Sequence, residues 1–210
     1  MQTRIIGHFA PVMEVDLYQG ETILCERGAM LYETPDIRSD AVLGMGFFSR
    51  LFTGESAALD KYEGPGTVAI AAGKPGMIKE LDLQPGQAID IAHSGFLAME
   101  PSVQFSISLA SHSLIRLIGM ASFARDNLIF QNLTGPGKVF MHVHGDYVIT
   151  RLEQGQTMMI DQGYLVFKDH SVELELVRVH GLENIVIGGE GLFLLQVTGP
   201  GYVGIQSMKG

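Results

Sequence analysis

The sequence has little of three things on which many proteins depend: cysteine, tryptophan and positive charge. Its 210 residues include one cysteine, Cys25, and no tryptophan. A single cysteine cannot form an internal disulfide, so nothing in the chain requires an oxidising compartment. Lysine and arginine number 14 against 23 aspartates and glutamates, which gives a net charge of −9. Because an acidic chain repels a phosphate backbone, we expect no nucleic acid partner.

Long apolar runs and targeting signals are also missing. No stretch reaches the ~18–20 apolar residues that a membrane-spanning helix needs, and the first residues lack the pattern of a cleavable signal peptide. These absences predict a cytoplasmic protein. One loop, residues 45–52 with the sequence MGFFSRLF, places two phenylalanines beside Arg50. This adjacency is typical of membrane interfaces, and it suggests peripheral membrane contact as a hypothesis.

The motifs of common enzyme classes are absent from the sequence. No GxGxxG motif opens a helix, and neither a Walker-type GK[ST] nor a GxSxG nucleophile elbow occurs. We therefore expect no nucleotide cofactor and no hydrolase chemistry.

Glycine, in contrast, is abundant and recurs in a fixed order. The segments LYQGETILCERGAML, LQPGQAIDIAHSGFLA and LEQGQTMMIDQGYLV follow one another at a period of about 70 residues, as do three Gly-Pro-Gly tripeptides. This period predicts three tandem units, which we place at residues 1–63, 64–134 and 135–210. The first and second glycines of the three segments are expected at turns or bulges that need a positive φ, and the glycines of the tripeptides are expected at turns. They are Gly20, Gly28, Gly64, Gly66, Gly86, Gly95, Gly135, Gly137, Gly155, Gly163, Gly199 and Gly201.

Apolar and polar residues alternate after each Gly-Pro-Gly, as in Val68, Ile70 and Ala72. A period of two predicts strands, and short turns at 73–76 and 144–147 suggest that each unit is roughly two hairpins. A unit of this size buries too little apolar surface to be stable alone, so the units should pack on one another or on units of other chains. The predicted fold class is all-β, built from three tandem units.

His142 and His144 form the sharpest chemical candidate. Alternation along a strand sends both imidazoles to one face, as in the metal sites of β-barrel proteins. The cupin pattern is not matched, because Gly137 lies one residue too close and residues 147–149 contain no glutamate. With no third ligand visible, we expect solvent-facing or hydrogen-bonded histidines and no bound metal. A cupin-like metal-dependent enzyme that uses His142 and His144 remains the alternative.

An acidic residue precedes each Gly-Pro-Gly by nine positions, at Glu55, Asp126 and Glu190. We interpret these carboxylates as acceptors of backbone N–H bonds at junctions between units, in preference to a functional ring of carboxylates. Cys25 lies where the other units have Ile91 and Ile160, so we expect a core position and an unreactive thiol.

Several segments resemble the altered-inheritance-of-mitochondria family, in its prokaryotic branch of unknown function. They are FTGESAAL, LQPGQ with the later GFLA, the strand after each Gly-Pro-Gly, and above all GGEGLFLLQVTGPGYVGIQS. The resemblance covers nearly the whole chain. It implies a fold similar to the tryptophan RNA-binding attenuation protein, in which a short double-stranded β-helix occurs three times per chain. It further implies that three chains close a ring of nine units.

The resemblance does not carry an activity with it. Eukaryotic relatives are linked to the organisation of the mitochondrial inner membrane, and binding of tryptophan or RNA does not follow from a shared shape. We therefore expect a non-catalytic homotrimeric β-ring that acts as a scaffold or binds a protein partner. A ring that binds a small ligand or RNA is a further alternative, which the acidic charge disfavours.

Overall fold

The computed structural model of the chain describes residues 1–42, 59–109, 129–161, 163–178 and 193–210. Every element in these residues is a β strand, apart from the 3-10 helix η2 at His93–Gly95. The prediction of an all-β chain is confirmed. Within the same residues, no helix has the length and apolar character to cross a membrane.

The strands follow β1 (Gln2–Ile6) in three consecutive sets of six. The first set is β2 (Val12–Leu17), β3 (Thr22–Glu26), β4 (Met30–Glu33), β5 (Arg38–Val42), β6 (Leu59–Glu63) and β7 (Gly66–Ala71). The second is β8 (Gly76–Leu83), β9 (Ala88–Ala92), β10 (Phe96–Met99), β11 (Gln104–Leu109), β12 (Ile129–Thr134) and β13 (Gly137–His144). The third is β14 (Tyr147–Leu152), β15 (Thr157–Asp161), β16 (Leu165–Asp169), β17 (Glu173–Arg178), β18 (Phe193–Thr198) and β19 (Gly201–Gln206).

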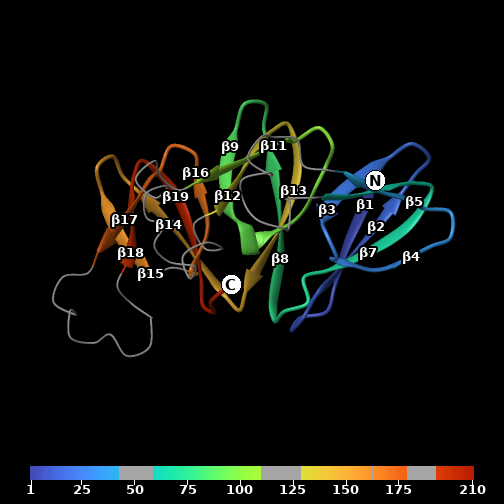
Figure 1. The fold of residues 1–210 in the computed structure, drawn as a ribbon, viewed down its shortest axis with the longest axis horizontal. Coiled ribbons are helices and arrows are strands. Elements are labelled where there is room, and N and C mark those ends of the chain that lie inside the picture. The colour runs from blue at the N-terminus through green and yellow to red at the C-terminus, as the bar shows by residue number, and fades with distance from the viewer. Residues whose placement is uncertain (43–58, 110–128, 162, 179–192) are drawn as a thin grey trace.

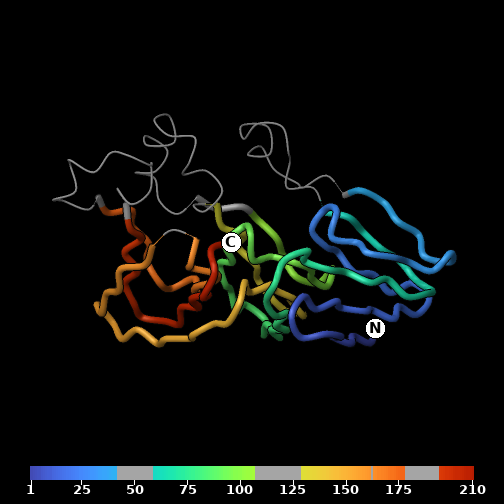
Figure 2. Tube along the Cα trace, turned by 90° about the horizontal axis from the view of Figure 1, so that it is seen from below, coloured from blue at the N-terminus to red at the C-terminus, as the bar shows by residue number. Residues whose placement is uncertain are grey.

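The same antiparallel pairings occur within each set. The sixth strand pairs with the first and the third, and the fifth strand pairs with the second and the fourth. Neighbouring sets are joined by two further pairings, β3 with β10 and β9 with β16. We call these two pairings the first seam and the second seam. Figures 1 and 2 show the three sets side by side in a row, with the first and third sets at its ends.

These pairings give four sheets. Sheet A has the order β1-β2-β7-β4, sheet B the order β5-β6-β3-β10-β13-β8, sheet C the order β11-β12-β9-β16-β19-β14, and sheet D the order β15-β18-β17. Each seam lies at the centre of a six-stranded sheet, B or C. Among the described residues, no sheet closes on itself.

The two predicted hairpin turns are wrong. Residues 73–76 lead from β7 in sheet A to β8 in sheet B, and residues 144–147 lead from β13 in sheet B to β14 in sheet C. Alternation along a strand shows which residues share a face, but it does not show which strand is the hydrogen-bonded neighbour. The short turns of this chain therefore connect sheets, where the sequence suggested hairpins within one sheet.

Most of the recurring glycines have the expected positive φ. It is 81° at Gly20, 79° at Gly86 and 76° at Gly155, and positive values also hold at Gly28, Gly66, Gly137, Gly163 and Gly201. The prediction of a positive φ is wrong for Gly95, which is not among the positive-φ glycines. Gly95 ends η2, and a Cβ there would lie 2.8 Å from Cγ2 of Val166. Close packing between the second and third sets thus excludes a larger residue at Gly95.

The apolar core consists of three clusters, each of which also contains buried residues from a neighbouring set. The largest buried side chains include Phe96, Phe130 and Phe140. Cys25 is fully buried in the first cluster, and burial raises its pKa to about 12. The prediction of a core cysteine is confirmed, and a thiol with so high a pKa is not a nucleophile at neutral pH.

Candidate functional site

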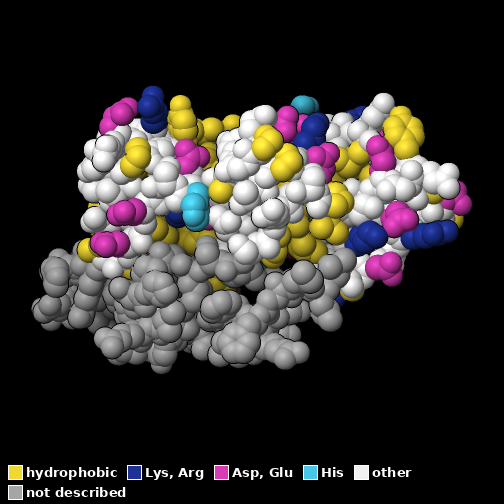
Figure 3. Space-filling model, turned by 90° about the horizontal axis from the view of Figure 1, so that it is seen from above, with side chains coloured by type: hydrophobic (Ala, Val, Ile, Leu, Met, Phe, Trp, Pro, Cys, Tyr) yellow, Lys and Arg dark blue, Asp and Glu magenta, His cyan; other side chains and the backbone are white. Residues whose placement is uncertain are grey.

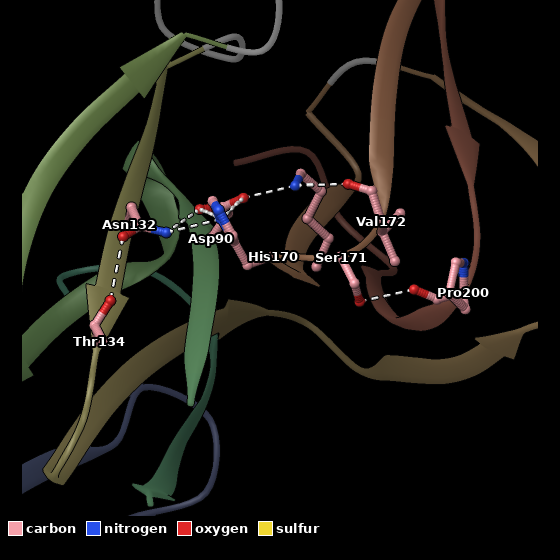
Figure 4. Close-up of polar contacts among 8 residues, drawn as sticks. Asp90, Asn132, Thr134, His170, Ser171, Val172 and Pro200 are labelled. Carbon is pink, nitrogen blue, oxygen red and sulfur yellow. Dashed lines mark hydrogen bonds and ion pairs between the residues drawn. The ribbon is translucent and has the colours of Figure 1, made fainter. Parts of the chain in front are cut away.

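The second seam contains a buried ion pair between two neighbouring sets of strands. Asp90 in β9 lies directly opposite Lys168 in β16, and Nζ of Lys168 is 2.6 Å from Oδ2 of Asp90. Figure 4 shows Asp90 beside Asn132 and His170. Their exposed fractions are only 4% and 7%. Lys168 also donates to the carbonyl oxygen of Val172 at 2.8 Å. Because both charges are buried, each depends on the other for its stability.

Two further side chains complete the surroundings of Asp90. Asn132 in β12 donates through Nδ2 to Oδ1 of Asp90 at 2.8 Å, and Nδ1 of His170 lies 3.4 Å from the same carboxylate. Burial alone would raise the pKa of Asp90, but hydrogen bonds from Lys168 and Asn132 outweigh it and hold this pKa below its usual value. Asp90 is therefore ionised at neutral pH, and its ion pair with Lys168 links the second set of strands to the third.

The first seam has the same backbone pairing with apolar side chains. Met99 in β10 lies opposite Leu24 in β3, and Ala98 lies opposite Cys25. Leu24 and Met99 thus occupy the places of Asp90 and Lys168. In the second seam the charges of Lys168 and Asp90 are paired with each other. The side chains of both seams hold two neighbouring strands together.

Two strands that match the seam strands have no partner on their outer edge. In sheet A the last strand is β4, and in sheet D the first strand is β15. On β4, the exposed fractions are 40% for Met30, 57% for Leu31 and 43% for Tyr32. On β15, Met159 is 46% exposed. In Figure 1 these strands lie toward opposite ends of the row. Exposed apolar side chains on an unpaired edge are typical of a surface that associates.

Glu33, at the end of β4, is a second indication that this strand lacks a partner. Its Oε2 is buried and has no hydrogen-bond partner among the described residues. A buried acceptor without a donor costs ~1–3 kcal/mol. A donor from outside the chain would remove that cost.

His142 and His144 lie close together near the end of β13. Their ring centroids are 4.6 Å apart, so the prediction that they share one face is confirmed. Their exposed fractions are 2% and 3%, which contradicts the solvent-facing interpretation. Burial lowers the pKa of His142 to about 4, and it also lowers that of His144. Both imidazoles are therefore neutral at neutral pH.

Several predicted site residues lie outside the described residues. These are the carboxylates Glu55, Asp126 and Glu190 and the loop 45–52. In the part of the chain that the structure describes, no group of three or more His, Cys, Asp or Glu side chains is placed to hold a metal ion. Acidic and basic side chains are interspersed on the face in Figure 3, and this face shows no broad basic patch.

The sequence analysis missed the ion pair of the second seam. Asp90 stands in the apolar strand AIDIA and Lys168 ends the apolar run LVFK. A charge inside an apolar strand is a recognisable signal, because lone charges are seldom buried. Pairing the two, however, needs the register of β9 against β16, which connects residues 78 positions apart.

The fold and the seams define a class of protein: an all-β chain of linked antiparallel sheets. The family description "Mitochondrial biogenesis AIM24" matches residues 3–208. The chain therefore belongs to this family, which confirms the resemblance found in the sequence.

The chain is also similar to two bacterial proteins. An uncharacterized protein of Streptococcus pyogenes serotype M6 is 26% identical over 212 residues, which cover 95% of this chain and 82% of the relative. A crystal structure of a Streptococcus pyogenes protein has a TM-score of 0.76 at 23% identity and covers 99% of this chain and 94% of that one. This structure supports the fold and carries no information on activity.

Proposed function

We propose that this protein is a non-catalytic scaffold, built from three tandem units, that assembles head to tail into a homotrimeric ring. The observation that carries the proposal is the relation between sheets A and D. Sheets B and C each contain a fourth, fifth and second strand of one set, followed by a third, sixth and first strand of the next. Sheet D contains the first half of this arrangement, and sheet A contains the second half together with β1.

Joining sheet D of one chain to sheet A of another produces the missing sheet. Its order, β17-β18-β15-β4-β7-β2, repeats the order of sheets B and C position by position. β15 then pairs with β4 of the next chain, as β3 pairs with β10 and β9 with β16. Such a contact is heterologous, so it continues around a ring and leaves neither β4 nor β15 unpaired once the ring closes.

The two seams also suggest a register for this third contact. Lys168 and Met99 occupy the position of Glu33, since all three pair with equivalent residues of a sixth strand. Glu33 of one chain therefore faces Met159 of the next. Gln196, opposite Met159 in β18, stands where Asn132 stands in the second seam, and its amide can donate to Glu33. This contact supplies a donor for the buried Oε2 and covers the exposed Met159.

The number of chains rests on the family resemblance, which implies nine units in three chains. A ring with both faces open offers surface for a protein partner. The proposed assembly does not depend on where the protein is located or on which partner it binds.

Two charge variants at one position test the proposal. Met159→Glu places a carboxylate opposite Glu33 of the next chain, and like charges directly opposite on paired strands are destabilising. Met159→Lys places an opposite charge there and imitates Lys168 with Asp90. Native mass spectrometry of the full chain measures the number of subunits. We expect trimers for the unchanged protein and for Met159→Lys, and monomers for Met159→Glu.

The two variants control each other, because both replace one exposed methionine by a charged side chain. Equal behaviour of the two would contradict the register of Glu33 against Met159. A monomeric unchanged protein at micromolar concentration would contradict the ring itself.

A further inference from the structure

β1 is the only described strand that lies outside the three sets. It pairs antiparallel with β2, the first strand of the first set, and so extends sheet A by one strand. The equivalent strands β8 and β14 have no such neighbour, because they end sheets B and C among the described residues. β1 therefore shows how an additional strand can be held at an edge that is open in the other two sets.

β1 and the segment after it also contact the second set of strands. Oγ1 of Thr3 donates to Oε2 of Glu80 in β8 at 3.4 Å. The backbone N–H of Gly76, at the start of β8, donates to the carbonyl oxygen of Phe9 at 2.8 Å. The additional strand of the first set is thus held both by the edge of β2 and by a side chain of the next set.

The junction between the second and third sets has the same backbone contact without the additional strand. The backbone N–H of Gly145 donates to the carbonyl oxygen of Pro75 at 3.2 Å. Ile149 in β14 stands where Glu80 stands in β8, since each lies opposite the fourth residue of a sixth strand. Ile149 is 49% exposed and its neighbour Val148 is 63% exposed. The place that corresponds to β1 therefore lies between the open edge of β8 and an apolar part of β14.

Burial differs between β2, which has the additional strand, and β8, which does not. Met13 and Val15 of β2 lie opposite residues of β1, and both are fully buried. Lys79 and Leu81 occupy the same positions of β8 and are only half-buried. A strand added to β8 would cover Leu81 and the aliphatic stem of Lys79, and it would pair the exposed backbone groups of this edge.

The other face of β8 determines the charge of the strand that fits there. Glu80 and Asp82 are both exposed on this face. Nζ of Lys138 in β13 lies 2.6 Å from Oε1 of Glu80, and Lys138 is also opposite Asp82. The backbone N–H of Lys138 donates to Oε2 of Glu100 at 2.8 Å. Three carboxylates thus surround one lysine, and the negative excess favours a basic strand.

β1 provides the pattern for such a strand. Arg4 lies opposite Glu14 and forms an ion pair with it, and Glu14 stands where Glu80 stands in β8. An antiparallel strand with the register of β1 places basic residues opposite Glu80 and Asp82, and it places an apolar residue opposite Leu81 and next to β14. Opposite charges and apolar pairs across strands are stabilising.

We propose that the open edge of β8 binds an extended basic segment of a protein partner, which adds to sheet B as β1 adds to sheet A. Backbone hydrogen bonds supply affinity in this mode of recognition, and the alternating side chains supply specificity. This inference rests on the proposed scaffold function, for which it names the kind of partner, but the site itself lies within one chain.

The test uses the full chain and a labelled peptide with the pattern of β1, of sequence SRIRTIG. Its arginines would lie opposite Asp82 and Glu80, and its first isoleucine opposite Leu81. Fluorescence anisotropy measures binding, and the control peptide SEIETIG has glutamates in place of the arginines. We expect saturable binding of one arginine peptide per chain, which weakens as salt is added, and affinity lower by at least about tenfold for the glutamate peptide.

Variants of the protein locate the site. Asp82→Lys reverses a charge of β8, and Ile149→Lys replaces the apolar neighbour in β14. We expect each to weaken binding of the arginine peptide by about tenfold or more. Asp16→Lys is the matched control, because Asp16 is the equivalent residue of β2, whose edge β1 already occupies; it should change the affinity by less than about twofold. Hydrogen exchange of the unchanged protein should show added protection at residues 76–83 when the peptide is bound.

Other outcomes overturn the proposal. No binding of the arginine peptide at millimolar concentration, or equal binding of both peptides, rejects a basic strand at this edge. Protection at 147–152 or 30–33 in place of 76–83 assigns the peptide to another edge, and this result does not depend on whether a variant folds. The monomer expected of Met159→Glu should bind the peptide as the unchanged protein does. A trimer that ignores the peptide therefore contradicts only this inference, and a monomer that binds it contradicts only the ring.

Discussion

The two seams have the same backbone pairing but opposite side-chain chemistry. In the first seam Leu24 faces Met99, and in the second Asp90 faces Lys168 at 2.6 Å. Backbone hydrogen bonds and apolar burial are therefore sufficient to join two sets of strands. The ion pair adds a condition on register, because a slip of one residue would leave two buried charges unpaired. We infer that the second seam gains specificity from its charges and the first gains stability from its apolar contacts.

The two seams also differ in the pKa of a carboxyl group on one of their strands. Asp90 in β9 has a paired lysine, and its pKa lies below the usual value. Glu26 ends β3 of the first seam, where burial raises its pKa to about 7 and the charge of Lys74 only partly opposes this. One carboxylate is thus stabilised in its charged form and the other in its neutral form. Variants at these two strands can separate the two effects.

The largest effect is expected from Lys168→Met, which removes the partner of a buried charge. Breaking a buried ion pair in this way costs about 3–5 kcal/mol, because Asp90 remains desolvated without compensation. Urea denaturation at pH 7 measures the free energy of unfolding. Lys209→Met is the control, since Lys209 pairs with Asp161 at 3.5 Å on the surface and should matter by less than about 1 kcal/mol. Equal losses in the two variants would show that the second seam does not bury its charges.

A smaller net change is expected when both charges are replaced by the residues of the first seam. Asp90→Leu with Lys168→Met gives the second seam the pair that Leu24 and Met99 form in the first. Replacing a buried ion pair by apolar residues is often neutral or stabilising by about 1–4 kcal/mol. We expect the double variant to unfold at a urea concentration equal to or above that of the unchanged protein. A double-mutant cycle with both single variants gives the coupling energy, and additive losses would contradict the comparison of the seams.

Much of the fold could be predicted from the sequence, because it depends on local patterns. Alternation identified strands, and the positive φ at Gly20, Gly86 and Gly155 followed from the spacing of glycines. The hairpins at 73–76 and 144–147 were wrong because pairing between strands is decided by contacts between distant residues. The positive φ predicted at Gly95 was wrong for the same reason. A larger side chain at this position would come too close to Val166 in another set. The division into three units at 63/64 and 134/135 stays a prediction.

The candidate site was predictable only in part. That His142 and His144 share a face followed from their spacing, but their burial depends on packing between the second and third sets, which a strand pattern does not contain. Asp90 and Lys168 were missed because their contact requires a register between strands of different sets. The roles of Glu55, Asp126 and Glu190 stay predictions, because these residues lie outside the described part of the chain.

The smallest effect, and the one that depends on pH, is expected from Glu26→Gln. The pKa of Glu26 is about 7 in the folded chain against an ordinary value of 4.5. Below pH 4.5 the carboxyl is protonated in both states, so the stabilising contribution is complete there. Between pH 4.5 and 7 the unfolded chain ionises first, and this contribution is lost as the pH rises. Glutamine stays neutral at every pH and avoids the loss.

Glu26→Gln should therefore leave stability unchanged at pH 4 and increase it by about 1–2 kcal/mol at pH 8, a value below the full pKa difference because Glu26 is partly exposed to solvent. Thermal unfolding of both proteins at pH 4, 6 and 8 measures the difference. Asp90 has the opposite dependence, since its lowered pKa makes its contribution disappear as the pH falls. A gain that is the same at pH 4 and pH 8 would mean that Glu26 is solvated in the folded chain. The strand β3 of the first seam would then contain no desolvated carboxyl group for comparison with Asp90 of the second.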